Sequence, residues 1–111
     1  MNKDKINVVI VEDEETVRLR VFSIIHKQKD YQIVGFFENG LDALEGIIQL
    51  KPDILVTDIN MPYLDGISLV ERIKNEIPYL KSIIITGFDE FDYAKRALEL
   101  EVVRFFNKTH Y

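Results

Sequence analysis

Three carboxylates stand directly after two short apolar runs of this chain. Glu12 and Asp13 follow residues 8–11, and Asp58 ends the run that begins at Ile54. If the three meet at one edge of a sheet, each pair about 4 Å apart repels by roughly 4 kcal/mol at an effective dielectric of about 20. A hard divalent cation such as Mg²⁺ is a natural counter-charge, because it binds carboxylates, water and phosphate oxygens. Alone, Asp58 is equally well interpreted as a helix cap.

Two further polar residues follow apolar runs nearer the end of the chain. Thr86 and Lys108 each have an ordinary interpretation, as a strand-end hydroxyl and as a solvated surface lysine. Together with the three carboxylates they predict a different chemistry. A nucleophilic Asp58, a metal site, a cation and a hydroxyl are what transfer of a phosphoryl group onto a carboxylate requires.

The composition sets the class of protein. The chain has 111 residues, 47% of them hydrophobic, which predicts one domain over residues 1–111 with a single core. The formal net charge of −5 argues against nucleic-acid binding by this chain. No apolar run approaches the roughly 20 residues of a membrane span, the N-terminus lacks a signal-peptide pattern, and cysteine is absent. We therefore expect a cytoplasmic protein without membrane contact.

The elements that must position these side chains are five apolar runs alternating with helical patterns. This alternation predicts an α/β fold with a doubly wound, five-stranded parallel sheet in the order 2-1-3-4-5, which is flavodoxin-like. In that order the first and third strands are neighbours, so Glu12, Asp13 and Asp58 are expected to share one crevice. The expected strands are 8–11, 32–37, 54–58, 82–86 and 102–106, and the expected helices begin near residues 16, 41, 66 and 90.

These residues resemble the receiver domain of two-component response regulators along essentially the whole chain. The match consists of 8–14, Asp58–Gly66, Thr86–Gly87 and Lys108. The resemblance implies that Asp58 accepts a phosphoryl group from a sensor histidine kinase. It also implies that Asp13 and Asp58 bind Mg²⁺ directly, Glu12 through water and Asn60 through its main-chain carbonyl.

The resemblance further implies a switch rather than a classical enzyme, with only self-phosphotransfer and autodephosphorylation. Thr86 and Lys108 would bind the phosphoryl oxygens. Movement of Thr86 would let Phe105 turn inward and change the surface made by the fourth helix and fifth strand. Residues 87–94 resemble receivers joined to AraC-type DNA-binding domains. We therefore expect a C-terminal DNA-binding output domain in the full-length protein, and control of transcription.

Two features depart from the family pattern. Thr109 follows Lys108 where proline is usual, which puts the approach of the lysine in question. The sequence ends at Tyr111, so the fifth helix is expected to be missing or truncated. The loss of that helix predicts a shortened chain, or a homodimer formed through an uncovered face with Phe105 or Phe106 exposed. Arg18 and Arg20 are interpreted as a solvated helix face.

Three rival functions remain open at this point. A degenerate receiver would bind partners without being phosphorylated. A phosphatase of the haloacid-dehalogenase type also uses an aspartate at the end of a strand, but it needs a second aspartate where this chain has Asn60. A flavin or nucleotide binder of the same fold would need a glycine-rich phosphate loop after the first strand, where Glu12 and Asp13 stand instead.

Overall fold

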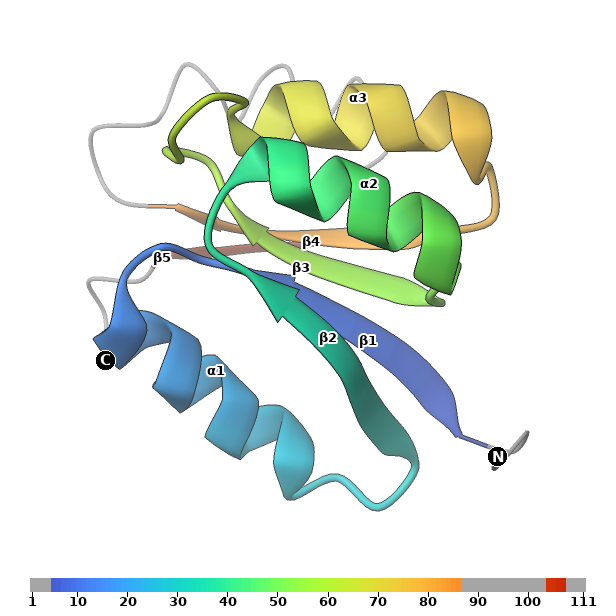
Figure 1. The fold of residues 1–111 in the computed structure, drawn as a ribbon. Helices are drawn as coiled ribbons and strands as arrows, with labels where there is room; N and C mark the ends of the chain where they lie inside the picture. The colour runs from blue at the N-terminus through green and yellow to red at the C-terminus, as the bar shows by residue number, and fades with distance from the viewer. Residues whose placement is uncertain (1–4, 87–103, 108–111) are drawn as a thin grey trace.

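The computed structural model describes residues 5–85 and the backbone of residues 86 and 104–107. Five parallel strands form one sheet in the order β2-β1-β3-β4-β5, which confirms the predicted strand order (Figure 1). The strands are β1 (Ile6–Val11), β2 (Tyr31–Phe37), β3 (Ile54–Asp58), β4 (Lys81–Thr86) and β5 (Arg104–Asn107). The expected helix at 90–100 lies outside the described residues.

Helices cover both faces of the sheet, as the alternating pattern predicts. Helix α1 (Glu15–His26) lies on one face, while α2 (Gly40–Leu50) and α3 (Gly66–Glu76) lie side by side on the other (Figure 1). Asn39 and Asp65 are the N-caps of α2 and α3, and each side chain accepts a hydrogen bond from a backbone N–H three residues further on. Glu14, the N-cap of α1, makes no such bond with its side chain. The start of α1 is therefore held in another way, which involves the candidate site.

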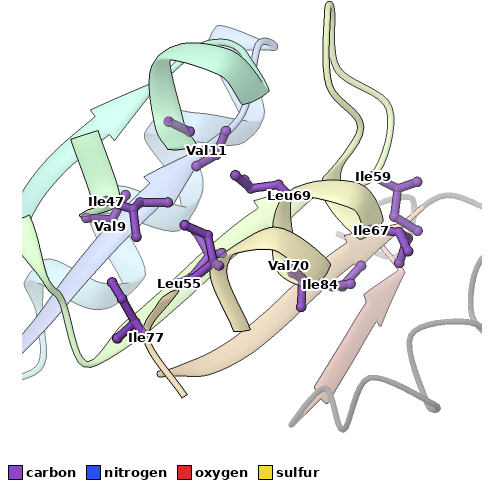
Figure 2. Close-up of a cluster of buried hydrophobic side chains, with 12 residues drawn as sticks. Val9, Val11, Ile47, Leu55, Ile59, Ile67, Leu69, Val70, Ile77 and Ile84 are labelled. Carbon is purple, nitrogen blue, oxygen red and sulfur yellow. The ribbon is translucent and has the colours of Figure 1, made fainter. Parts of the chain in front are cut away.

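The larger part of the core lies between the sheet and the pair α2 and α3. Val9, Val11, Leu55 and Ile84 from the strands pack there against buried side chains of both helices, as Figure 2 shows. The apolar stripe predicted for α3 is fully buried: Leu69, Val70, Ile73 and Ile77. Close packing of these branched aliphatic side chains makes this face the more rigid of the two faces of the sheet.

The α1 face carries a smaller core and an open apolar pocket of about 380 Å³. Its buried members are Val8, Ile10, Val21, Val56 and Ile85. Ile24, which the helical pattern places with the inward residues, lines this pocket and is 51% exposed. The expected exposure of Phe105 or Phe106 concerns side chains outside the described residues.

The apolar pattern that marks α2 in the sequence, Leu41, Leu44, Ile47 and Ile48, is only partly buried. Of these four residues, Ile47 is buried and Leu44 packs against the core, whereas Leu41 and Ile48 are 49% and 37% exposed. The buried side is made by Ala43 and Ile47, and at Gly46 an added Cβ would overlap the ring of Phe37. Small residues let α2 approach the sheet closely, and a pattern built on large apolar residues reveals only part of that face.

Candidate functional site

Strands β1 and β3 bring three carboxylates together at the carboxyl edge of the sheet. Val11 pairs with Thr57 in the register of the two strands, so the residues that follow each of them are neighbours. The nearest oxygens of Glu12, Asp13 and Asp58 all lie within 4.8 Å of one another. The structure thus places in one group the three residues that were predicted to share a crevice.

The three carboxylates differ in burial. Glu12 is 0% exposed and Asp58 is 1% exposed, whereas Asp13 is exposed. Burying carboxylates side by side is costly unless positive charge or hydrogen-bond donors offset the repulsion. Oxygen ligands from one exposed and two buried carboxylates fit a hard cation such as Mg²⁺ better than a soft transition metal. The residues present therefore fit the metal that the sequence predicts.

Backbone donors fix the orientation of both buried carboxylates. The N–H of Ile59 donates to Oδ1 of Asp58 at 2.8 Å, and the N–H of Glu14 donates to Oε2 of Glu12 at 3.0 Å. The second bond ties the side chain of Glu12 to the N-cap of α1. Each carboxylate is consequently held by the chain that immediately follows it, which reduces the freedom lost when a ligand binds.

The loop after Asp58 is closed by contacts of its own. The N–H of Gly66 donates to the carbonyl oxygen of Ile59 at 2.7 Å, and Tyr63 adopts a left-handed φ of 72°. Tyr63 is 81% exposed, so its aromatic ring projects from the rim of the site. The loop holds Asn60, which is exposed two residues beyond Asp58.

The remaining predicted residues are placed only by their backbone or not at all. Thr86 ends β4 one residue after Ile85, the register partner of Asp58, so its backbone lies at the same sheet edge. Phe105 lies in β5 opposite Ile84, but its side chain is outside the described residues. Lys108 and Thr109 also lie outside them, so the lysine contact stays a prediction.

One residue of the site was misinterpreted from the sequence. Arg18 was taken for part of a solvated helix face, but its side chain is only 13% exposed. Its Nη1 donates to the main-chain oxygen of Glu12 at 3.1 Å and lies 3.3 Å from Oε1 of Glu38. The signal was available: Arg18 precedes the buried Val21 by three residues, a spacing that puts both on one side of a helix.

The comparisons with known proteins agree with this geometry. Residues 8–110 match the response regulator receiver domain family, and the chain belongs to that family. Phosphorylation-based switching is the standard function of these domains. Within the described part of the chain, no helix has the length and apolar character of a membrane span.

Individual relatives share about a third of the sequence. The response regulator protein VraR of Staphylococcus saprophyticus is 35% identical over 104 residues, which are 94% of this chain and 50% of that protein. The chain thus spans about half the length of the curated relatives it matches. VraR of Staphylococcus aureus is 34% identical over the same length.

Solved structures give the same fold. The response regulator domain of Thermotoga maritima CheB matches with a TM-score of 0.87 and 35% identity, over 96% of this chain and 80% of that one. The receiver domain of AraT from Geobacillus stearothermophilus matches with a TM-score of 0.82 and 32% identity, over 92% and 80%. A DNA-binding response regulator of the LuxR family from Staphylococcus aureus matches with 0.86 and 27% identity, over 96% and 88%.

Proposed function

We propose that Asp58 is the phosphoacceptor of this receiver domain and that residues 1–111 form one signalling module. The supporting observation is the grouping of Glu12, Asp13 and Asp58 within 4.8 Å at the carboxyl edge of the sheet. A purely structural cluster of this kind is self-repelling, whereas a phosphoryl-transfer site needs both the nucleophile and the acidic metal ligands.

The residues divide the work of the reaction as follows. A carboxylate oxygen of Asp58 forms a bond to phosphorus while the bond from phosphorus to the imidazole nitrogen of a phosphohistidine breaks, and that nitrogen keeps the electron pair. The Ile59 N–H holds the carboxylate of Asp58 in a fixed rotation during the attack. Glu12, Asp13, Asp58 and the main-chain carbonyl of Asn60 would hold Mg²⁺, which when bound neutralises charge on the phosphoryl oxygens.

The switch follows from the charge that is added at Asp58. A phosphoryl group brings roughly −1.5 to −2 charge and three acceptor oxygens. Thr86 and Lys108 would donate to those oxygens from the ends of β4 and β5, and movement of Thr86 would make room for Phe105. The readout is a change in the surface that the expected fourth helix and β5 form.

The partners follow from the same chemistry. The phosphoryl donor is a sensor histidine kinase, and this places the reaction in the cytoplasm, where the ATP that charges the kinase is found. The output is a C-terminal DNA-binding domain in the full-length protein. The LuxR-family match, named as a DNA-binding response regulator, supports such an output, and the AraC-type resemblance of residues 87–94 names another type.

The test is intact-mass measurement after incubation with Mg²⁺ and acetyl phosphate. We expect the gain of one phosphoryl group, abolished in Asp58→Asn and by removal of Mg²⁺. Asp53→Asn is the matched control, because Asp53 is exposed directly before the same strand and Asn keeps an oxygen for the Asn7 N–H. No gain at saturating donor would refute the proposal and favour a degenerate receiver.

A further inference from the structure

Arg18 connects the residues that follow β1 to those that follow β2. Its Nη1 donates to the carbonyl oxygen of Glu12 at 3.1 Å and lies 3.3 Å from the carboxylate of Glu38. Glu38 is 65% exposed, while the Arg18 side chain is 13% exposed. The arginine is thus the buried partner of the ion pair, and it contacts the backbone of the acidic cluster.

A β-bulge in β2 supplies the second support of this arginine. Val8 pairs with Ile33 but Val9 pairs with Gly35, so Val34 is an extra residue in the strand. After the bulge, Phe36 is paired with Ile10, whose side chain belongs to the α1-side core. The Arg18 guanidinium carbon lies over the Phe36 ring, 5.3 Å from the ring centroid. The bulge therefore places an aromatic ring where it holds the guanidinium by a cation–π contact.

These contacts converge on Glu12. Its N–H donates to the carbonyl oxygen of Phe37 at 3.0 Å, and its own carbonyl accepts from Arg18. Its side chain accepts from the N–H of Glu14, whose carbonyl in turn accepts from the N–H of Arg18 at 2.9 Å. Both the main chain and the side chain of Glu12 are thus fixed through the first turns of α1 and the end of β2.

We propose that Arg18 is a positioning residue for the metal site, acting through the main chain of Glu12. The proposal rests on the proposed function, because it assigns Glu12 and Asp13 to Mg²⁺ binding. Without Arg18 the Glu12–Asp13 peptide loses its donor, and both carboxylates lose their fixed placement relative to Asp58. Removal of groups that orient metal ligands commonly weakens affinity by about 10-fold to 100-fold. Arg18 contacts main chain rather than a ligand oxygen, so we expect the lower end, about 10-fold.

A purely structural role predicts a different result. If Arg18 only joins α1 to β2, its loss lowers the melting temperature but leaves the dissociation constant for Mg²⁺ unchanged. Direct titration calorimetry with Mg²⁺ and no phosphodonor therefore separates the two roles, since it measures affinity in the folded protein independently of phosphorylation.

The experiment compares four variants with the unmodified chain. Arg18→Gln is expected to weaken Mg²⁺ binding about 10-fold. Arg18→Lys keeps the charge and the long apolar stem, so it folds, and its loss of the planar guanidinium should weaken binding a few-fold. Arg20→Gln is the matched control on the same helix, at an exposed position. Glu38→Gln retains an acceptor oxygen for Arg18. The Arg20→Gln and Glu38→Gln variants should bind Mg²⁺ with a dissociation constant within two-fold of that of the unmodified chain.

The outcomes distinguish this inference from the proposed function. If the unmodified chain binds Mg²⁺ and the folded Arg18 variants bind it equally well, the positioning role is refuted and the phosphoacceptor proposal stands. If the unmodified chain binds no Mg²⁺, both fail. A parallel loss in Arg20→Gln would also overturn the inference, because it would reflect a general effect of charge on α1.

Discussion

Gly66 lies directly against the main-chain carbonyl of Asp58. A Cβ at position 66 would overlap that oxygen. The N–H of Gly66 also donates a hydrogen bond to the carbonyl of Ile59, the residue that follows Asp58. The first residue of α3 is therefore packed on the backbone of the candidate phosphoacceptor. This contact fixes the position of the Asp58 backbone relative to the start of α3. It leaves no space for a side chain at position 66.

The substitution Gly66→Ala should destabilise the fold and impair phosphorylation at Asp58. The clash is with backbone, so β3 or α3 must shift, at a cost of about 1–3 kcal/mol. Urea unfolding measures the loss. Gly35→Ala is the control, because there the nearest atom, 3.0 Å away, is the flexible end of Leu50. Equal losses in the two variants would show that the contact with Asp58 is unimportant.

Mg²⁺ should raise the free energy of unfolding of this chain. At a hundred times its dissociation constant, a ligand that binds only the folded state adds about 2.7 kcal/mol. Asp13→Asn should remove most of that gain without harming the metal-free fold, because Asp13 is exposed. Chemical unfolding with and without Mg²⁺ checks both statements. A gain that persists undiminished in Asp13→Asn would place the metal elsewhere.

Ile47→Ala should be far more damaging than Ile48→Ala, although the residues are adjacent in α2. Ile47 is 0% exposed in the larger core, whereas Ile48 is 37% exposed. Truncation of a buried isoleucine costs about 2–5 kcal/mol, and the exposed one should cost well below that. The two denaturation midpoints give the comparison. Similar midpoints would contradict the observed orientation of α2.

Asp65→Ala should shift the start of α3. The carboxylate accepts from the N–H of Ser68 at 2.8 Å and from its hydroxyl at 3.2 Å. Loss of an N-cap costs about 1 kcal/mol. Asp65→Asn keeps an acceptor oxygen and should retain most of that stability in thermal unfolding. Should Asp65→Asn prove as unstable as the alanine variant, the cap would owe its strength to charge rather than to the hydrogen bond.

The strand order and the meeting of Glu12, Asp13 and Asp58 could be predicted because they depend on simple regularities. Apolar runs of strand length alternate with helical patterns, and right-handed crossovers leave one natural order for five parallel strands. Once β1 and β3 are neighbours, residues at their carboxyl ends must be close. The burial of each carboxylate could not be predicted, because the sequence does not distinguish the buried Glu12 from the exposed Asp13 beside it.

The spacing of Arg18 and Val21 indicates the inward side of the helix, but the contact of Arg18 with Phe36 could not be predicted from pattern because it depends on the bulge at Val34. The single extra residue in β2 places Phe36 on the face of the sheet that α1 covers. A continuous run of apolar residues gives no sign of such a shift in register. The inward side of α2 could be predicted only in part, through Leu44 and Ile47, for a related reason. Ala43 and Gly46 face the sheet because they are small, and hydropathy favours the larger Leu41 and Ile48.

The N-cap of α1 has a thermodynamic consequence for the whole helix. Because the Glu14 N–H is satisfied by the side chain of Glu12, local unfolding of α1 must also disrupt the acidic cluster. The helix rests on the smaller core, so its amide hydrogens are expected to exchange with solvent before those of α2 and α3. A cation held by the cluster would slow that exchange selectively, so the protection of α1 amides would report how much of the site is occupied.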